Sequence, residues 1–177
     1  MNNIENMPTS PAACMARLDG LSIPYTLYEH VAVFTVAESA QVERDIHAHH
    51  TRNMFLRTKK KQNFLVTLSH DTPIDLKKLE NLLAVKNFSF GSPERLFEIL
   101  GVYPGSVTPL SVINAPSDKL TVILEKRMMD APLVAYHPLL NTMTVTLTPQ
   151  DLLKYIRDCG FEPMIVDLSP AAPDDTL

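Results

Sequence analysis

The stretch Leu100-Gly-Val-Tyr-Pro-Gly-Ser-Val-Thr-Pro-Leu-Ser-Val-Ile-Asn114 decides how this chain is organised. It holds two of the five glycines and two of the fourteen prolines in the 177-residue sequence. Gly101 follows a helical pattern and suits the left-handed residue that ends a helix. Pro104-Gly105 is a turn dipeptide, and Pro109 removes one backbone donor at the far end. We expect a loop between Gly105 and Pro109 that either links two elements or presents backbone groups to a ligand.

Helix and strand signals alternate irregularly on both sides of this loop. Capping residues followed by proline, or spaced as a capping box, predict where helices begin, and alternating apolar residues predict strands. Helices are expected at 12–18, 36–45, 76–83, 93–100 and 149–160, with a short helix or turn at 126–131. Strands are expected at 24–28, 53–57, 64–69, 88–90, 120–124, 133–136, 142–147 and 163–166. Hairpins mixed with crossovers favour a mixed α/β fold with packed helices.

The length suggests one domain, which we place at residues 9–168, between a flexible N-terminus (1–8) and a disordered Pro- and Asp-rich tail (169–177). No apolar run is long enough to cross a membrane, and no export signal is visible. Cys14 and Cys159 lie far apart and outside any C-x-x-C motif. Paired thiols are therefore not expected, and the sequence favours a cytoplasmic protein without membrane contact.

Positive charge is concentrated in one segment, although the net charge of the chain is −4. Between Arg52 and Arg95 there are nine basic residues and four acidic ones, so this segment carries +5 and the remainder −9. Local fields steer ligands more than net charge does. The segment either attracts a polyanion or forms a solvated hairpin tip, at Lys59-Lys60-Lys61, and solvated helix faces.

No common catalytic or nucleotide-binding motif is present. The histidines at 47, 49 and 50 resemble a metal site, but no further ligand lies close in sequence, so neither a metal nor another cofactor is expected. His137 differs from the other histidines because it stands at Tyr136-His-Pro138, where a strand ends beside an extended turn. It either lines a pocket or makes a structural hydrogen bond.

Four short segments stand out in order along the chain: Arg52-Asn-Met-Phe-Leu-Arg-Thr-Lys-Lys60, Gly91-Ser-Pro-Glu-Arg-Leu96, Gly101-Val-Tyr-Pro-Gly-Ser-Val-Thr-Pro109 and Tyr136-His-Pro-Leu-Leu-Asn-Thr-Met-Thr144. Together they resemble the YbaK and prolyl-tRNA-synthetase-associated family, and the similarity covers residues 18–168. The long form of the third segment, from Gly101 to Asn114, resembles the subgroup that hydrolyses alanyl-tRNA(Pro) more than the subgroup that acts on cysteinyl-tRNA(Pro).

The resemblance implies a barrel-like, mixed β core wrapped by helices, and it implies roles for particular residues. The loop Gly105-Ser106-Val107-Thr108-Pro109 would face the aminoacyl ester through its backbone, and His137 would line the pocket. Arg52 stands where the family has lysine. The arginine keeps the positive charge but presents it in a different geometry. Arg52 and Asn53 would hold the end of the tRNA, and Lys59 and Lys60 its phosphates.

The function implied is trans-editing: hydrolysis of mischarged tRNA(Pro), with alanyl-tRNA(Pro) as substrate and no cofactor. An aminoacyl ester is already activated, so a held water and donors for the developing oxyanion suffice, without a side-chain nucleophile. The family is thought to use the substrate's own ribose hydroxyl to help activate that water. The alternatives are action on cysteinyl-tRNA(Pro), a binding module without turnover, and an editing domain that works only when docked on prolyl-tRNA synthetase.

Overall fold

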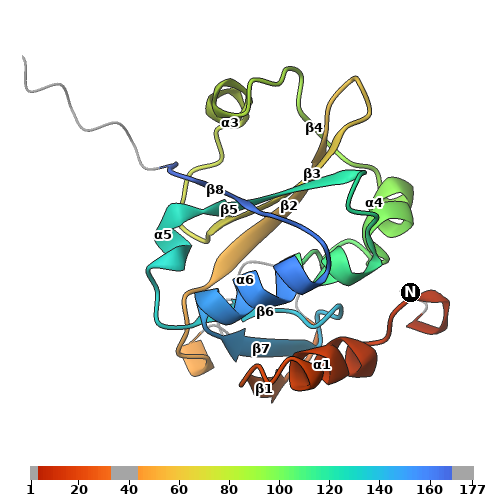
Figure 1. Ribbon diagram of the computed structural model, residues 1–177, viewed down its shortest axis with the longest axis vertical. Coiled ribbons are helices and arrows are strands. Elements are labelled where there is room, and N and C mark those ends of the chain that lie inside the picture. Colours follow the sequence, from red (N-terminus) through yellow and green to blue (C-terminus); the bar gives the residue numbers. More distant parts are fainter. Residues whose placement is uncertain (1–3, 33–43, 169–177) are drawn as a thin grey trace, which may run out of the picture.

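Two sheets form the framework of the structure, a computed structural model that describes residues 4–32 and 44–168 (Figure 1). The larger sheet has the strand order β4-β2-β3-β5-β8, in which β3 pairs antiparallel with β2 and parallel with β5. The smaller sheet has the order β1-β7-β6 and is antiparallel. The strand bounds are β1 Thr26–Glu29, β2 Thr51–Arg57, β3 Asn63–Ser69, β4 Ser89–Phe90, β5 Leu120–Glu125, β6 Val134–Tyr136, β7 Met143–Leu147 and β8 Met164–Val166.

The helices begin where the sequence places capping residues. The Ser10, Ser92 and Thr148 hydroxyls and the Asp75 carboxylate each accept a hydrogen bond from the backbone N–H three residues on. Each of these bonds satisfies a donor that the first helical turn leaves unpaired. The bounds are η1 Ile4–Asn6, α1 Pro11–Gly20, α3 Leu76–Leu82, α4 Pro93–Leu100, η2 Pro109–Asn114, α5 Lys126–Met129 and α6 Pro149–Asp158, with η marking a 3₁₀ helix.

The core is divided between the two faces of the larger sheet. One cluster includes Leu65 of β3, Val145 of β7 and Ile156 of α6, so it fills the space between the sheets in which Figure 1 shows α6. A smaller cluster, with Met54 and Leu79, lies on the opposite face under α3. Because β3 is covered on both faces, all seven of its residues are buried. That explains why its sequence is a nearly unbroken apolar run.

The predicted mixed α/β fold is confirmed, but the barrel-like closure is not observed. Neither sheet closes among the described strands; a single parallel bridge, between His49 and Val134, connects the chain just before β2 with β6. Of the predicted helix at 36–45, only residues 44 and 45 are among the described residues, and the tail at 169–177 lies wholly outside them. None of the described helices has the length and apolar character needed to cross a membrane.

The segments flanking the glycine-proline loop pack against each other. At the end of α4, Gly101 has φ 64°, and a Cβ there would lie 2.5 Å from Pro8 and 2.6 Å from the Asn114 amide. The Thr9 hydroxyl donates to Asn114 Oδ1 at 2.6 Å. The apolar run after the loop forms η2 because Thr108 caps it and Pro109 supplies its first residue.

Candidate active site

The loop from Gly105 to Pro109 is a tight turn fixed by its own polar groups. Gly105 has φ 89°, a conformation that other residues rarely adopt. The Ser106 N–H donates to the Tyr103 carbonyl at 3.0 Å. Thr108 Oγ1 accepts from the Leu110 N–H at 3.3 Å, which starts η2. The backbone on the Gly105 side of this turn is thus held in one conformation, as a site built from main-chain groups requires.

Ser106 is the exception within this loop. Its side chain is fully buried, and its Oγ is the one buried side-chain oxygen or nitrogen of the described residues with no hydrogen-bond partner. Ser111, five residues later, is equally buried, but its Oγ donates to the Thr108 carbonyl at 2.6 Å. Buried hydroxyls are normally paired, because an unpaired one loses its bonds to water without replacement. A buried hydroxyl without a protein partner is the kind of group that a bound water or ligand satisfies.

The start of β2 presents Arg52 and Asn53 on opposite faces of the sheet. Asn53 is paired with Thr67, whose Oγ1 donates to Asn53 Oδ1 at 2.9 Å, on the face that packs between the sheets. Arg52 lies on the other face, where its Nη2 donates to the His70 carbonyl at 2.6 Å. Adjacent residues of a strand must alternate in this way. The guanidinium keeps further N–H donors besides the one used by His70.

The single bridge between the sheets joins the chain just before β2 to β6. His49 lies opposite Val134 in a parallel pair, three residues before Arg52 and His137 respectively, and His137 directly follows β6. The Thr51 hydroxyl donates to the Ala135 carbonyl at 3.4 Å, which continues the contact between the two chains. The contact therefore brings the start of β2 close to β6, the strand that His137 follows.

His137 is held with a defined tautomer. Its Nδ1 lies 2.7 Å from the Met143 carbonyl, which can only accept, so Nδ1 carries the proton and Nε2 is left as an acceptor. Burial lowers the pKa of His137 below its usual range, and neighbouring His30, with ring centroids 6.0 Å apart, acts in the same direction. No described residue is hydrogen-bonded to Nε2. At neutral pH His137 therefore offers an uncharged acceptor.

Two residues near His137 were not among the predicted site residues. Thr144 lies on β7, and its hydroxyl is 2.9 Å from His30 Nε2 and 3.5 Å from His137 Nδ1. His30 donates from Nδ1 to the Val31 carbonyl at 2.9 Å, so its Nε2 accepts from the threonine hydroxyl. The alternation of threonines in β7 is visible in the sequence, but the pairing that brings His30 beside it is not.

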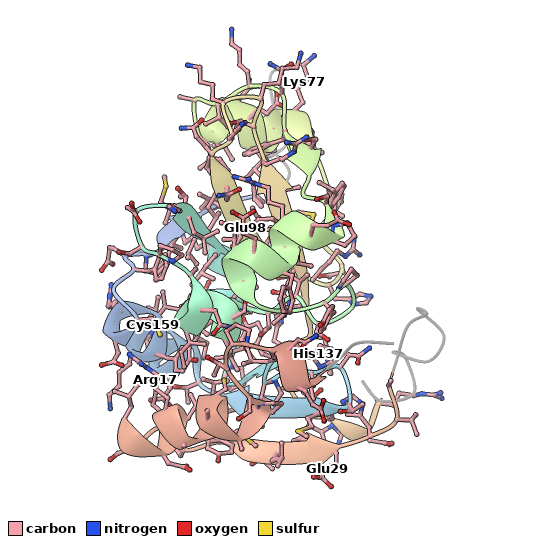
Figure 2. All side chains as sticks on the ribbon, turned by 90° about the vertical axis from the view of Figure 1, so that its right-hand side faces the viewer. Arg17, Glu29, Lys77, Glu98, His137 and Cys159 are labelled. Atoms are coloured by element: carbon pink, nitrogen blue, oxygen red, sulfur yellow. The ribbon has the colours of Figure 1, made fainter. Side chains whose placement is uncertain are left out.

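Lys59 and Lys60 lie far from this group. They are exposed at the turn after β2, whose end at Arg57 is already about 17 Å from Arg52 at about 3.4 Å per residue. Figure 2 shows His137 in the lower half of the molecule and Lys77 of α3 at its upper end; in Figure 1 the β2–β3 turn lies at that upper end too. The described residues make no hydrogen bond between the Gly105–Pro109 loop and Arg52, Asn53 or His137.

Other candidates for chemistry are occupied or inert. His49 Nε2 is bonded to the Ser69 hydroxyl at 2.8 Å and His50 Nε2 to the Ile46 carbonyl at 2.9 Å. No group of three or more metal-binding side chains occurs in the described part of the chain. Burial raises the pKa of the Cys14 and Cys159 thiols to about 11, so neither is a thiolate at neutral pH.

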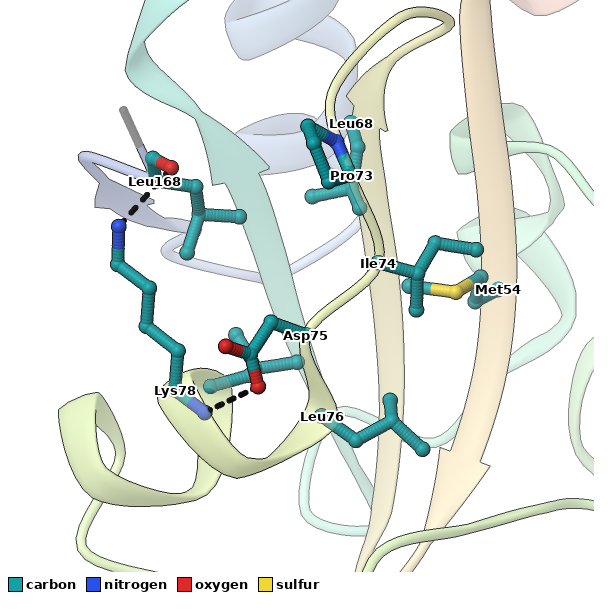
Figure 3. Close-up of a pocket in the computed structure, with 9 residues that line it drawn as sticks. Met54, Leu68, Pro73, Ile74, Asp75, Leu76, Lys78 and Leu168 are labelled. Carbon is teal, nitrogen blue, oxygen red and sulfur yellow. Dashed lines mark hydrogen bonds between the residues drawn. The ribbon is translucent and has the colours of Figure 1, made fainter. Parts of the chain in front are cut away.

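An apolar hollow of about 220 Å³ lies apart from all of these residues (Figure 3). It is formed beside α3 by side chains that include Met54, Leu68 and Ile74. At its edge Lys78 Nζ donates to the Leu168 carbonyl at 3.0 Å. None of the predicted site residues lines this hollow, so it adds nothing to the candidate active site.

Comparison with known proteins identifies relatives over most of the chain. Residues 30–155 match the family model described as an aminoacyl-tRNA editing domain. The prolyl-tRNA editing protein ProX of Acetoanaerobium sticklandii is 36% identical over 149 residues, which are 84% of this chain and 91% of that protein. The prolyl-tRNA synthetase associated domain-containing protein 1 of Bos taurus is 33% identical over 161 residues, 88% of this chain and 94% of that protein.

A solved structure described as that of a candidate trans-editing enzyme for prolyl-tRNA synthetase has the same fold. It superposes with a TM-score of 0.71 over 92% of this chain and 99% of that one, at 19% sequence identity. Residues 30–155, the region that matches the family model, contain Arg52, Asn53, His137 and the loop from Gly105 to Pro109.

Proposed function

Because the chain belongs to the aminoacyl-tRNA editing domain family, we propose that it is a trans-editing deacylase that hydrolyses mischarged tRNA(Pro), with alanyl-tRNA(Pro) as its substrate. Water adds to the carbonyl carbon of the ester, the bond from that carbon to the ribose oxygen breaks, and the ribose oxygen takes a proton. The products are free alanine and uncharged tRNA(Pro). The reaction needs no redox partner and no energy source.

The observation that carries this proposal is the conformation of the Gly105–Pro109 loop. A left-handed glycine and a buried hydroxyl without a partner stand together inside the region that matches the family. Preorganised donors of this kind stabilise the charge that develops on an ester carbonyl during attack by water. In this proposal the loop amides and the Ser106 hydroxyl bind the carbonyl oxygen.

His137 and Arg52 have supporting roles in the proposed site. The uncharged Nε2 of His137 accepts a hydrogen bond from the bound substrate, and Arg52 binds the phosphate or ribose of the terminal nucleotide. Asn53 points to the opposite face of β2, where its Oδ1 accepts from Thr67 and its Nδ2 is the donor that this proposal assigns to the tRNA end. Arginine is always protonated, so Arg52 takes no part in proton transfer. The ribose hydroxyl next to the ester helps to activate the water.

The size of the pocket would have to distinguish alanine from proline. A pocket can discriminate against a smaller amino acid only by losing contacts, and a missing methylene contact is worth only ~1–3 kcal/mol. It can exclude a larger one more strongly, by steric clash. A pocket that fits alanine would therefore exclude the larger, cognate proline. Alanine and cysteine differ by a thiol, which makes cysteinyl-tRNA(Pro) the competing substrate.

The test is a deacylation assay with alanyl-, cysteinyl- and prolyl-tRNA(Pro), run with the protein alone and with prolyl-tRNA synthetase. We expect rapid loss of alanine, with prolyl-tRNA(Pro) largely spared. Equal rates on alanyl- and prolyl-tRNA(Pro) would rule out editing, and faster loss of cysteine would reassign the substrate. Binding without release of any amino acid would make the chain a binding module, and activity only with the synthetase would make docking part of the mechanism.

A further inference from the structure

The glycine-proline loop is attached to two different parts of the fold. Its first half packs on α4, where the centroid of the Tyr103 ring lies 4.9 Å from that of the Phe97 ring. Its second half continues into η2, which is held to α6 because the Tyr155 hydroxyl donates to the Leu110 carbonyl at 3.0 Å. The turn from Gly105 to Pro109 lies between the two halves. Its geometry therefore depends on how α4 and η2 are placed relative to each other.

Asn114 ties these two elements together. It is the last residue of η2, and its Nδ2 donates at 2.9 Å to the carbonyl of Leu100, the last residue of α4. The last carbonyls of a helix have no partner within the helix, so this bond satisfies one of them and also joins the two ends of the loop, fourteen residues apart in the sequence. Because a carbonyl can only accept, the Asn114 amide must turn its Nδ2 towards Leu100 and its Oδ1 away from it.

The N-terminal segment holds the other side of the same amide. The Thr9 hydroxyl donates to Asn114 Oδ1 at 2.6 Å. Pro8 packs at this place too, since a Cβ at Gly101 would lie 2.5 Å from Pro8 Cγ and 2.6 Å from Asn114 Nδ2. Figure 1 shows the N-terminal segment at the α4 side of the molecule. We call the hydrogen-bonded group of Thr9, Asn114 and the Leu100 carbonyl the loop clasp; Thr9 lies outside residues 30–155, the region that matches the family model.

We propose that Asn114 is a positioning residue for deacylation, which holds the amides of the Gly105–Pro109 loop where they meet the developing oxyanion, and that Thr9 keeps Asn114 in place. The proposal rests on the proposed function for the identity of the reaction. The Gly105 and Val107 N–H groups have no hydrogen-bond acceptor in the part of the chain that the structure describes, so they are donors whose direction the clasp sets. Such donors stabilise charge only at the correct distance, and a displacement of about 1 Å can cost about 10²-fold in rate.

Asn63 provides a matched control away from the loop. Its Nδ2 donates to the Lys119 carbonyl at 2.8 Å, and its Oδ1 accepts from Arg95 Nε at 2.7 Å. Asn63 is the first residue of β3, directly after the β2–β3 turn. Asn114→Ala and Asn63→Ala therefore each remove one amide that donates to a backbone carbonyl and accepts from a side chain, and only the first of these amides belongs to the clasp.

The test is single-turnover deacylation of alanyl-tRNA(Pro) at increasing protein concentration, on variants whose melting temperatures have been compared. Asn114→Ala should lower the rate constant at saturating protein by about 10–100-fold, with little change in the half-saturating concentration, because the loop faces the ester and not the RNA helix. Asn63→Ala should keep the wild-type rate constant. Thr9→Val removes the hydroxyl from a side chain of the same shape and should cost about two- to twelvefold in the rate constant for one neutral hydrogen bond, whereas Thr9→Ser should restore the rate.

A folded Asn114→Ala protein with the wild-type rate constant would overturn the proposal, as would a loss no greater than that of Asn63→Ala. A change in the half-saturating concentration alone would also overturn it, because it would place Asn114 in RNA binding. If Asn114→Ala does not fold, the Thr9 pair decides: a valine variant as fast as the serine variant would refute the clasp. A wild type that releases no amino acid would instead refute the proposed function.

Discussion

Replacing Ser106 by alanine should leave the fold as stable as before, or make it more stable, while slowing deacylation. The buried Oγ has no partner among the described residues, and such a group costs about 1–3 kcal/mol. Removing it relieves that cost, against a packing loss of about 0.8 kcal/mol for an atom group the size of a methylene. The free energy of unfolding should therefore rise by about 0–2 kcal/mol, or about 0–8 °C in melting temperature for a chain of this length.

The matched control is Ser111→Ala. Ser111 is as deeply buried and lies only five residues away, but its hydroxyl bond to the Thr108 carbonyl is lost in the variant. That loss should destabilise the protein by about 0.5–1.5 kcal/mol, because the Thr108 carbonyl keeps its hydrogen bond from the Ser111 N–H at 3.2 Å. The two serines should therefore shift the unfolding free energy in opposite directions, which urea denaturation of both variants can measure.

Activity supplies the second half of the same test. If the Ser106 hydroxyl binds the carbonyl oxygen as the charge develops, its removal should lower kcat/KM on alanyl-tRNA(Pro) by about 10²–10³-fold, as for other oxyanion donors. A Ser106→Ala protein that is clearly less stable but fully active would refute the reasoning. It would show that the hydroxyl has a structural partner, such as an ordered water, and no role towards the substrate.

Four further predictions concern other parts of the site. Gly105→Val should abolish turnover in a folded protein, because a β-branched residue disfavours φ 89° and crowds the ester; normal deacylation would make the loop a connector. Arg52→Ala should cost about 1.5–3 kcal/mol in kcat/KM for a lost charged hydrogen bond, whereas Arg52→Lys should retain most activity; an active alanine variant would show a solvated charge. Burial lowers the pKa of His137, so on acidification the unfolded state takes up this proton before the native state does. The contribution of His137 to the free energy of unfolding is therefore present above pH ~6.5 and is lost as the pH falls through its native pKa. Urea denaturation should give unfolding free energies of wild type and His137→Gln that converge towards acid pH, and a constant difference between them would contradict this. Glu125→Gln should lower the free energy of unfolding by about 1.5–3 kcal/mol, since the buried carboxylate accepts from the Ser69 N–H at 2.6 Å and the Thr72 hydroxyl at 2.7 Å; unchanged denaturation curves would show that the amide replaces both bonds.

Much of the local structure followed from the sequence because its causes are local. A cap at Ser92, proline at the next position and a left-handed Gly101 define α4 within ten residues, and the structure confirms each of them. Gly91 is required for a different reason: a Cβ there would lie 2.3 Å from the Phe55 ring. That second reason depends on a strand more than thirty residues away and could not be read from the sequence.

The long-range pairings were beyond what the sequence patterns could indicate. The parallel contacts of β5 with β3 and β8 join segments separated by long connections, and their register is set by packing on both faces of the sheet. The bridge between His49 and Val134 is a single pair, yet it joins the chain entering β2 to the strand that His137 follows. The resemblance supplied the identity of Arg52 and His137 as site candidates, and only the fold showed which elements connect them.

The distance between the two ends of β2 has a consequence for specificity. In the proposed site the loop donors and His137, which read the amino acid, are uncharged. The RNA contacts expected of Lys59 and Lys60 are charged and lie beyond the end of β2, which is about 17 Å from Arg52. Salt screens the second set far more strongly than hydrogen bonds made in a buried pocket. Raising the ionic strength should therefore increase KM for alanyl-tRNA(Pro) with little effect on kcat, and it should leave the ratio of alanyl to prolyl hydrolysis unchanged. If that ratio varied with salt, the amino acid and the RNA would be read by the same residues, and the separation along β2 would have no functional meaning.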